Sequence, residues 1–238
     1  MPWSSCPLTP GIRPRRLPAL GLLALLAGAG CVSPGGPGAG TPLVPTRYQT
    51  RTGPYVVATN APLPADAPAL RQLQALERQV EATLGLRVDP AAAPIEIYIL
   101  DNREAFTRFL TFHYPEFPRR RAFFLAQGQR RVVYTFLGDR LPEDLRHEAT
   151  HALLHATVGG VPLWLDEGLA EYFESPDDPG GVNLEHLGPL PEDLAAGWVP
   201  DLRRLEDLED VRRMSPRDYR EAWAWTHYLL HAPGPGKA

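Results

Sequence analysis

The stretch that decides the fold is His147-Glu148-Ala149-Thr150-His151, in a chain of 238 residues. Two residues four positions apart lie on one face of an α-helix, about 6 Å apart along its axis. Imidazoles at this spacing can bind a single Zn²⁺, and Glu148, beside the first imidazole, would point at the open side of the metal. The flanks favour a helix, because Pro142 suits its first turn, acidic residues follow, and a later Gly-Gly pair ends it.

A second helix is predicted over residues 164–173, opened by Pro162. A catalytic zinc ion usually has three protein ligands and one water, so two histidines need a partner. Glu167 follows His151 by 16 positions, which leaves enough chain for a tight loop and a helix antiparallel to the first. Its carboxylate can complete a His₂Glu set, and Glu171, one turn later, is placed to accept the free N–H of one metal-bound imidazole.

These two stretches closely resemble the gluzincin zinc metallopeptidases, including the thermolysin-like and aminopeptidase-N-like branches. His-Glu-Ala-Thr-His-Ala-Leu-Leu at 147–154 and Trp-Leu-Asp-Glu-Gly-Leu-Ala-Glu-Tyr-Phe-Glu at 164–174 look most like the peptidase-MA-like bacterial domains, the group that contains the DUF1570 families. The resemblance covers roughly residues 55–231, but its specific motifs occupy three short stretches. The gap between His151 and Glu167 is shorter than in the familiar peptidases, which implies a trimmed intervening loop.

The resemblance implies a role for five residues of the two helices. His147, His151 and Glu167 would be the zinc ligands. Glu148 would be the general base, and Glu171 would lie behind the ligands as a supporting carboxylate.

A third stretch, residues 218–223, resembles the helix that carries the transition-state tyrosine in the aminopeptidase-like branch. The resemblance implies that Tyr219 is this residue. A buried or capping tyrosine on the same helix is the alternative.

Two other metallopeptidase patterns do not match. Metzincins need a glycine three residues after the second histidine, where this chain has Leu154, and deformylase-like sites need a cysteine ligand, whereas the two cysteines are Cys6 and Cys31. His155 continues the four-residue series, but it lies about 12 Å along the helix from His147, too far to share one metal. We predict that His155 packs or forms a hydrogen bond.

The first 30 residues are typical of an export signal. Three arginines precede an apolar run at 17–29, which is too short for a comfortable transmembrane span of about 20 residues. Ala-Gly-Ala-Gly-Cys at 27–31 resembles a lipoprotein cleavage box with Cys31 as the lipidated residue, although Gly28 stands where Leu is usual. Ordinary cleavage near Gly30 is the alternative. Residues 31–47, rich in Pro and Gly, would link the membrane to the domain.

The remaining pattern predicts an α+β, zincin-like domain over residues 48–232, followed by a tail at 233–238. A small mixed sheet in an N-terminal αβ portion would precede the two motif helices and a short helical C-terminal portion. Strands are expected at 55–59, 95–100, 122–126 and 131–136, and helices at 67–84, through 106–110, and at 219–230. The last two strands form a hairpin that either borders a substrate cleft or is simply part of the sheet.

Charge argues against nucleic acid as a partner. The formal net charge is −4, and removing residues 1–30, with three arginines and no acid, makes it −7, without a basic stripe. The predicted function is zinc-dependent hydrolysis of a peptide or protein substrate outside the cytoplasm, by an envelope lipoprotein or, without the lipid, a secreted protein. Two alternatives stay open: a catalytically silent zinc-binding scaffold, and an envelope-maintenance lipoprotein whose motif is incidental.

Overall fold

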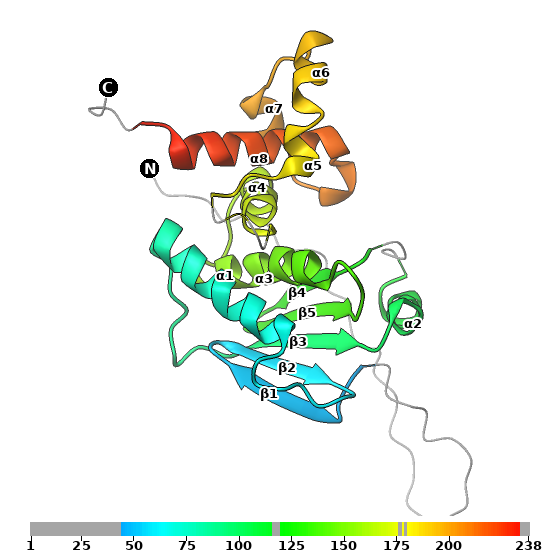
Figure 1. Ribbon diagram of the computed structural model, residues 1–238. Coiled ribbons are helices and arrows are strands. Elements are labelled where there is room, and N and C mark those ends of the chain that lie inside the picture. The colour runs from blue at the N-terminus through cyan, green and yellow to red at the C-terminus, as the bar shows by residue number, and fades with distance from the viewer. Residues whose placement is uncertain (1–43, 116–119, 176–177, 179, 234–238) are drawn as a thin grey trace, which may run out of the picture. The chain divides into compact units, whose positions relative to one another are not determined.

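The computed structural model (Figure 1) describes residues 44–115, 120–175, 178 and 180–233. The predicted export signal, Cys31, most of the predicted linker and nearly all of the predicted tail lie outside these residues. Among the described residues, no helix is long and apolar enough to cross a membrane. All of these described residues belong to one unit.

Five strands form one mixed sheet. They are β1 (Tyr48–Thr52), β2 (Tyr55–Thr59), β3 (Ile95–Leu100), β4 (Phe123–Gln127) and β5 (Arg130–Phe136), in the order β1-β2-β3-β5-β4. β2, β3 and β5 run parallel, while β1 and β4 pair antiparallel with their neighbours and form the two edges. The small mixed sheet is therefore confirmed. β1 was not predicted as a strand, because its side chains are mostly polar and exposed.

The helices follow from apolar residues at helical spacing. They are α1 (Pro68–Leu84), α2 (Arg103–His113), α3 (Leu141–Thr157), α4 (Leu163–Phe173), α5 (Leu184–Leu187), α6 (Leu190–Ala195), α7 (Leu202–Glu206), the 3₁₀ turn η1 (Val211–Arg213) and α8 (Pro216–His231). α1 ends at Gly85, whose φ of 69° is left-handed, and α8 begins with a capping box between Ser215 and Asp218. α8 thus starts three residues before the predicted helix, and α5 and α6 lie in a stretch where no helix was predicted.

The two faces of the sheet carry different helices. Ile95, Ile97 and Ile99 of β3 are buried in the main core with residues of α1 and α3. The alternate positions of β5, Val132 and Tyr134, pack in a second cluster with the aromatic residues of α2. The alternation along the strands therefore places the α3 motif on the better-covered face.

Further helices extend the layers away from the sheet. α4 packs against α3, and α8 packs against α4 (Figure 1). Gly168 of α4 allows this close approach, because a Cβ atom there would lie 2.5 Å from the carbonyl oxygen of Ala222 in α8. α4 is therefore a middle layer with one side towards α3 and the other towards α8.

Candidate metal centre

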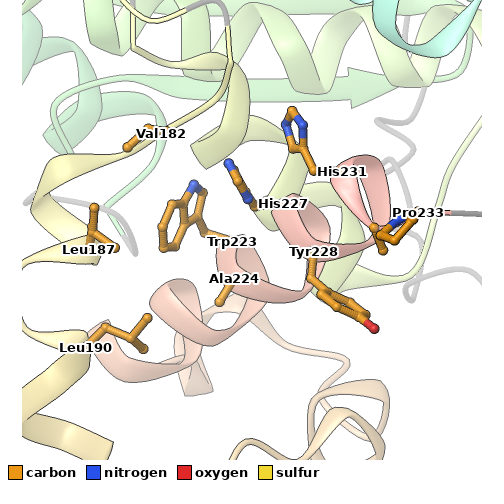
Figure 2. Close-up of a pocket in the computed structure, with 10 residues that line it drawn as sticks. Val182, Leu187, Leu190, Trp223, Ala224, His227, Tyr228, His231 and Pro233 are labelled. Atoms are coloured by element: carbon orange, nitrogen blue, oxygen red, sulfur yellow. The ribbon is translucent and has the colours of Figure 1, made fainter. Parts of the chain in front are cut away.

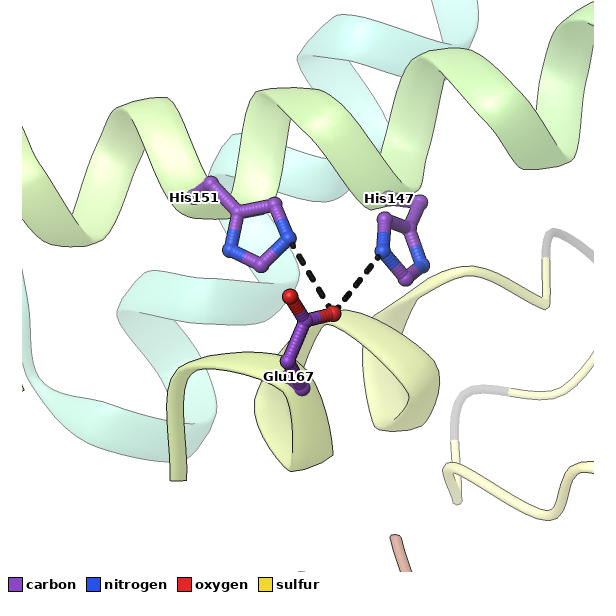
Figure 3. Close-up of side chains that lie close together, drawn as sticks. All are labelled: His147, His151 and Glu167. Atoms are coloured by element: carbon purple, nitrogen blue, oxygen red, sulfur yellow. Dashed lines mark ion pairs between the residues drawn. The ribbon is translucent and has the colours of Figure 1, made fainter. Parts of the chain in front are cut away.

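Three side chains from α3 and α4 converge on one point. Figure 3 shows His147 and His151 projecting from α3 towards Glu167 of α4. Oε2 of Glu167 lies 3.5 Å from Nε2 of His147 and 3.7 Å from Nε2 of His151. One donor atom from each residue lies within 4.8 Å of the other two, an arrangement that could hold a metal ion.

Burial and hydrogen bonding show that the group fits a cation. Glu167 is 5% exposed and His151 is 6% exposed. Within the described part of the chain, the buried Oε2 of Glu167 has no hydrogen-bond partner. An unsatisfied buried carboxylate oxygen is costly, and a metal ion bound jointly with two imidazole nitrogens would satisfy it.

Each imidazole has a carboxylate close to its Nδ1 atom, and the contact of His147 is a hydrogen bond. Nδ1 of His147 is 3.1 Å from Oε2 of Glu174, and Nδ1 of His151 is 3.1 Å from Oδ2 of Asp166. A carboxylate at Nδ1 favours the tautomer that carries its proton there, so that the lone pair of Nε2 faces Glu167. The contacts also establish that the helices are antiparallel, since His151 meets the start of α4 and His147 meets its end.

The residue behind His147 differs from the prediction. Glu171 was expected to accept the N–H of one of the two imidazoles, but Glu174 is the partner of His147. Glu174 lies seven residues, or two helical turns, after Glu167, so the same periodicity that found Glu171 could have found it. Asp166, next to the predicted ligand, was also missed.

Glu171 has different partners, both on the segment that follows α4. Nε2 of His186 lies 2.8 Å from Oε2 of Glu171, and the Asn183 amide donates to the same oxygen at 3.2 Å. Asn183 also donates to Oε1 of Glu174 at 2.8 Å. His186, for which no role was predicted, therefore belongs to a network that ends at His147. Glu171, Glu174 and His147 also form a second group that could hold a metal, but it shares His147 with the first.

The carboxylates around His147 and His151 stabilise positive charge at this centre. Burial alone would lower the pKa of His147, but its contacts with the carboxylates of Glu167 and Glu174 outweigh burial and raise that pKa well above its ordinary value. For His151, burial is likewise outweighed, chiefly by Asp166 and Glu167, and its pKa is raised. Without a metal, protons on the imidazoles supply the charge, so protons and a cation would compete for the site.

Glu148 lies beside the group on α3 and is 7% exposed. Burial raises the pKa of its carboxyl, while the charges of His147 and His151 oppose the rise. The shift is in the direction that makes a carboxylate a better proton acceptor near neutral pH.

Tyr219 of α8 lies within electrostatic range of the same group. Burial, followed by the negative charge of Glu167, raises the pKa of its phenol to about 12, and the charges of His147 and Glu171 also act on it. The phenol is therefore a protonated hydrogen-bond donor at neutral pH.

Strand β4 is the sheet edge beside this centre. The ring of Phe124 lies 6.1 Å from that of His151 and 5.1 Å from that of His155. Nε2 of His155 lies 3.9 Å from Asp166, in the packing and polar role expected for it. Phe124 of β4, the edge strand of the hairpin, therefore packs beside His151.

A separate cavity lies away from this group. About 580 Å³ in volume, it runs along α8 and is lined by apolar residues of α5 and α6 together with Trp223, His227 and His231 (Figure 2). None of the three candidate metal ligands lines it. Trp223 in its lining contacts the hydrogen-bond network behind the centre, since its ring lies 5.7 Å from that of His186.

Residues 143–233 match the family model described as "Protein of unknown function (DUF1570)". No curated protein matches the chain. The match covers both motif helices and α8, and it confirms the DUF1570 part of the resemblance. The gluzincin peptidase part stays a prediction.

Proposed function

We propose that the protein is a zinc-dependent peptidase. The observation that carries this proposal is the convergence of His147, His151 and Glu167 within 4.8 Å, with the buried carboxyl of Glu148 beside them. Two imidazoles and one carboxylate with a neighbouring glutamate are the donor set of a catalytic zinc site rather than a closed structural one.

When bound, Zn²⁺ would act as a Lewis acid and lower the pKa of its water towards about 7. Glu148 takes the proton from the attacking water and delivers it to the leaving amine. Its buried position and raised pKa suit both transfers. Glu174 and Asp166 keep the two imidazoles oriented throughout.

Tyr219 would donate a hydrogen bond to the oxygen that becomes negative as the peptide carbonyl is attacked. Its high pKa keeps it protonated for this role. Losing one such donor typically costs about 10²- to 10³-fold in rate.

The edge strand β4 suits an extended peptide substrate. One side of β4 pairs with β5, so its other side offers backbone groups beside His151. An extended peptide can add to such an edge as a further strand.

We further propose that the enzyme acts outside the cytoplasm. The export signal, and lipidation of Cys31 or cleavage near Gly30, would place the domain at the cell envelope or release it. Its partners would then be peptides or proteins of that compartment and, through the lipid, the membrane.

Two alternatives lead to different measurements. A silent scaffold would bind zinc without turnover, and a lipoprotein with an incidental motif would bind none. The buried Glu148 favours the enzyme, because a site that only holds zinc has no need of a base.

Zinc content and digestion of a peptide library by the full chain test the proposal, with Glu148→Gln as the key variant. We expect about one zinc per chain in both proteins, and cleavage by the wild type alone. Zinc without cleavage in either protein supports the scaffold. Absence of zinc refutes the proposal.

A further inference from the structure

Arg146, the residue before His147, is buried with 1% of its surface exposed. Its Nε donates to the backbone carbonyl of Phe173 at 2.7 Å. Its two amino groups reach amide oxygens of α1, those of Gln79 and, at 3.5 Å, Gln72. One guanidinium therefore joins α3 to the end of α4 and to two turns of α1.

The chemistry of this contact is unusual for a core position. All three partners of the buried guanidinium are neutral. Burying a charge without a counter-ion is expensive, and an apolar side chain would fill the same space more cheaply. The compensation lies at α4, because Phe173 is its last residue and helix ends present unpaired carbonyls with partial negative charge.

The contact forms one of two adjacent links between the helices. Arg146 holds Phe173, and the next residue on α3, His147, holds the next residue after α4, Glu174. The position of the Phe173 carbonyl thus determines where the Glu174 side chain starts. That side chain in turn orients the imidazole of His147 towards Glu167.

We propose that Arg146 is a positioning residue that acts through Glu174 to orient His147 for metal binding. This inference rests on the metal site of the proposed function, but it does not require peptide cleavage. It explains why a charged residue occupies a place where packing alone would favour an apolar one.

A double-mutant cycle on the full chain tests the inference, with the zinc dissociation constant measured by chelator competition. We expect Arg146→Met and Glu174→Gln each to weaken zinc binding by about 10- to 100-fold, as for other groups that orient metal ligands. Because Arg146 acts through Glu174, adding Arg146→Met to Glu174→Gln should weaken binding by less than about threefold. Arg146→Lys, which keeps a charged donor, should recover part of the affinity.

Val57→Ala, a core change in β2, is the control for general destabilisation: it should lower the melting temperature and leave zinc affinity unchanged. If Arg146→Met fails to fold, Gln79→Leu replaces it, since this change loosens the guanidinium and leaves α3 and α4 intact. Unchanged affinity in the Arg146 variants, or losses that multiply in the cycle, would overturn the inference. A wild type that binds zinc without cleaving peptides would contradict the proposed function alone.

Discussion

Carboxylates behind the imidazoles decide what the candidate ligands can bind. Glu174 and Asp166 lie at the Nδ1 atoms, so both Nε2 atoms are directed at Glu167. A histidine with a free ring could rotate or change tautomer, and either change would remove a ligand. Metal binding at this centre would therefore depend on residues that are not themselves proposed ligands.

Exchange of Glu174 for Gln should weaken zinc binding by about 10- to 100-fold, because the amide is a poor acceptor for the Nδ1 proton. Glu171→Gln makes the same charge change one helical turn earlier, at a residue bonded to His186 and Asn183. It should weaken binding by less than about threefold. Competition with a chromogenic chelator measures both constants, and equal effects would return the supporting role to Glu171.

Among the helices, α4 makes close contacts on two sides, with α3 and with α8. Glu167 faces α3, and Gly168, its neighbour in the chain, faces α8. The spacing between α4 and α8 therefore affects both Tyr219 and the ligand set.

Gly168→Ala should force these helices apart, because the new Cβ would meet the Thr226 hydroxyl and the Ala222 carbonyl. We expect a loss of about 1–3 kcal/mol in the free energy of unfolding, measured by urea denaturation. Gly160→Ala is the matched control, since nothing lies within 4 Å of a Cβ at that exposed position. It should change stability by no more than about 0.5 kcal/mol. A Gly168 variant as stable as this control would show that the helices are not packed as described.

An ion pair between two strands of the sheet leads to a prediction of how stability changes with pH. Arg130 of β5 donates to Glu96 of β3, and this hydrogen bond lowers the pKa of the carboxyl. Because the folded pKa lies below the unfolded value of about 4.3, the pair stabilises the fold above that value and ceases to do so as the pH falls through the folded pKa.

Glu96→Gln should therefore reduce stability at pH 7 by no more than about 1 kcal/mol, since both side chains are partly exposed. The difference between wild type and variant should disappear below the folded pKa of Glu96. Denaturation curves at several pH values provide the measurement. A difference that grows on acidification would contradict the assigned sign.

For the whole molecule, a metal at this centre would tie the middle layer to the sheet. α3 packs against β3, β4 and β5, whereas the main contacts of α4 are with α3 and α8. A bound ion would therefore add a strong link between α3 and α4. A ligand that binds only the folded state stabilises it in proportion to the logarithm of its concentration.

Zinc at 1,000 times its dissociation constant should add about 4 kcal/mol, a rise of roughly 8–16 °C in melting temperature for a domain of this size. Calorimetry of the full chain with zinc and with excess chelator measures the shift. His151→Ala should lose the shift, and Glu148→Gln should keep it, because Glu148 is not a proposed ligand. A shift of equal size in His151→Ala would place the ion elsewhere.

Local patterns in the sequence were sufficient for most elements and for the motif itself. Helical spacing marked α1, α3 and α4, and alternation marked β3, because these patterns depend on neighbours a few residues apart. The pairing of His147 with His151 follows from the same short-range geometry, whereas Glu167 was assigned as the third ligand through the resemblance to the gluzincin motif. β1 was not predicted, because its side chains are mostly polar and its pairing with β2 is what makes it a strand.

Only the tertiary structure decided which groups support the motif. That Glu174 rather than Glu171 meets His147, that His186 joins the network and that Arg146 holds the end of α4 all depend on how α4 is placed against α3. That placement is set by contacts between residues far apart in the chain, such as Gly168 with Ala222. Periodicity determines which side of a helix a residue occupies, but packing determines what it meets there.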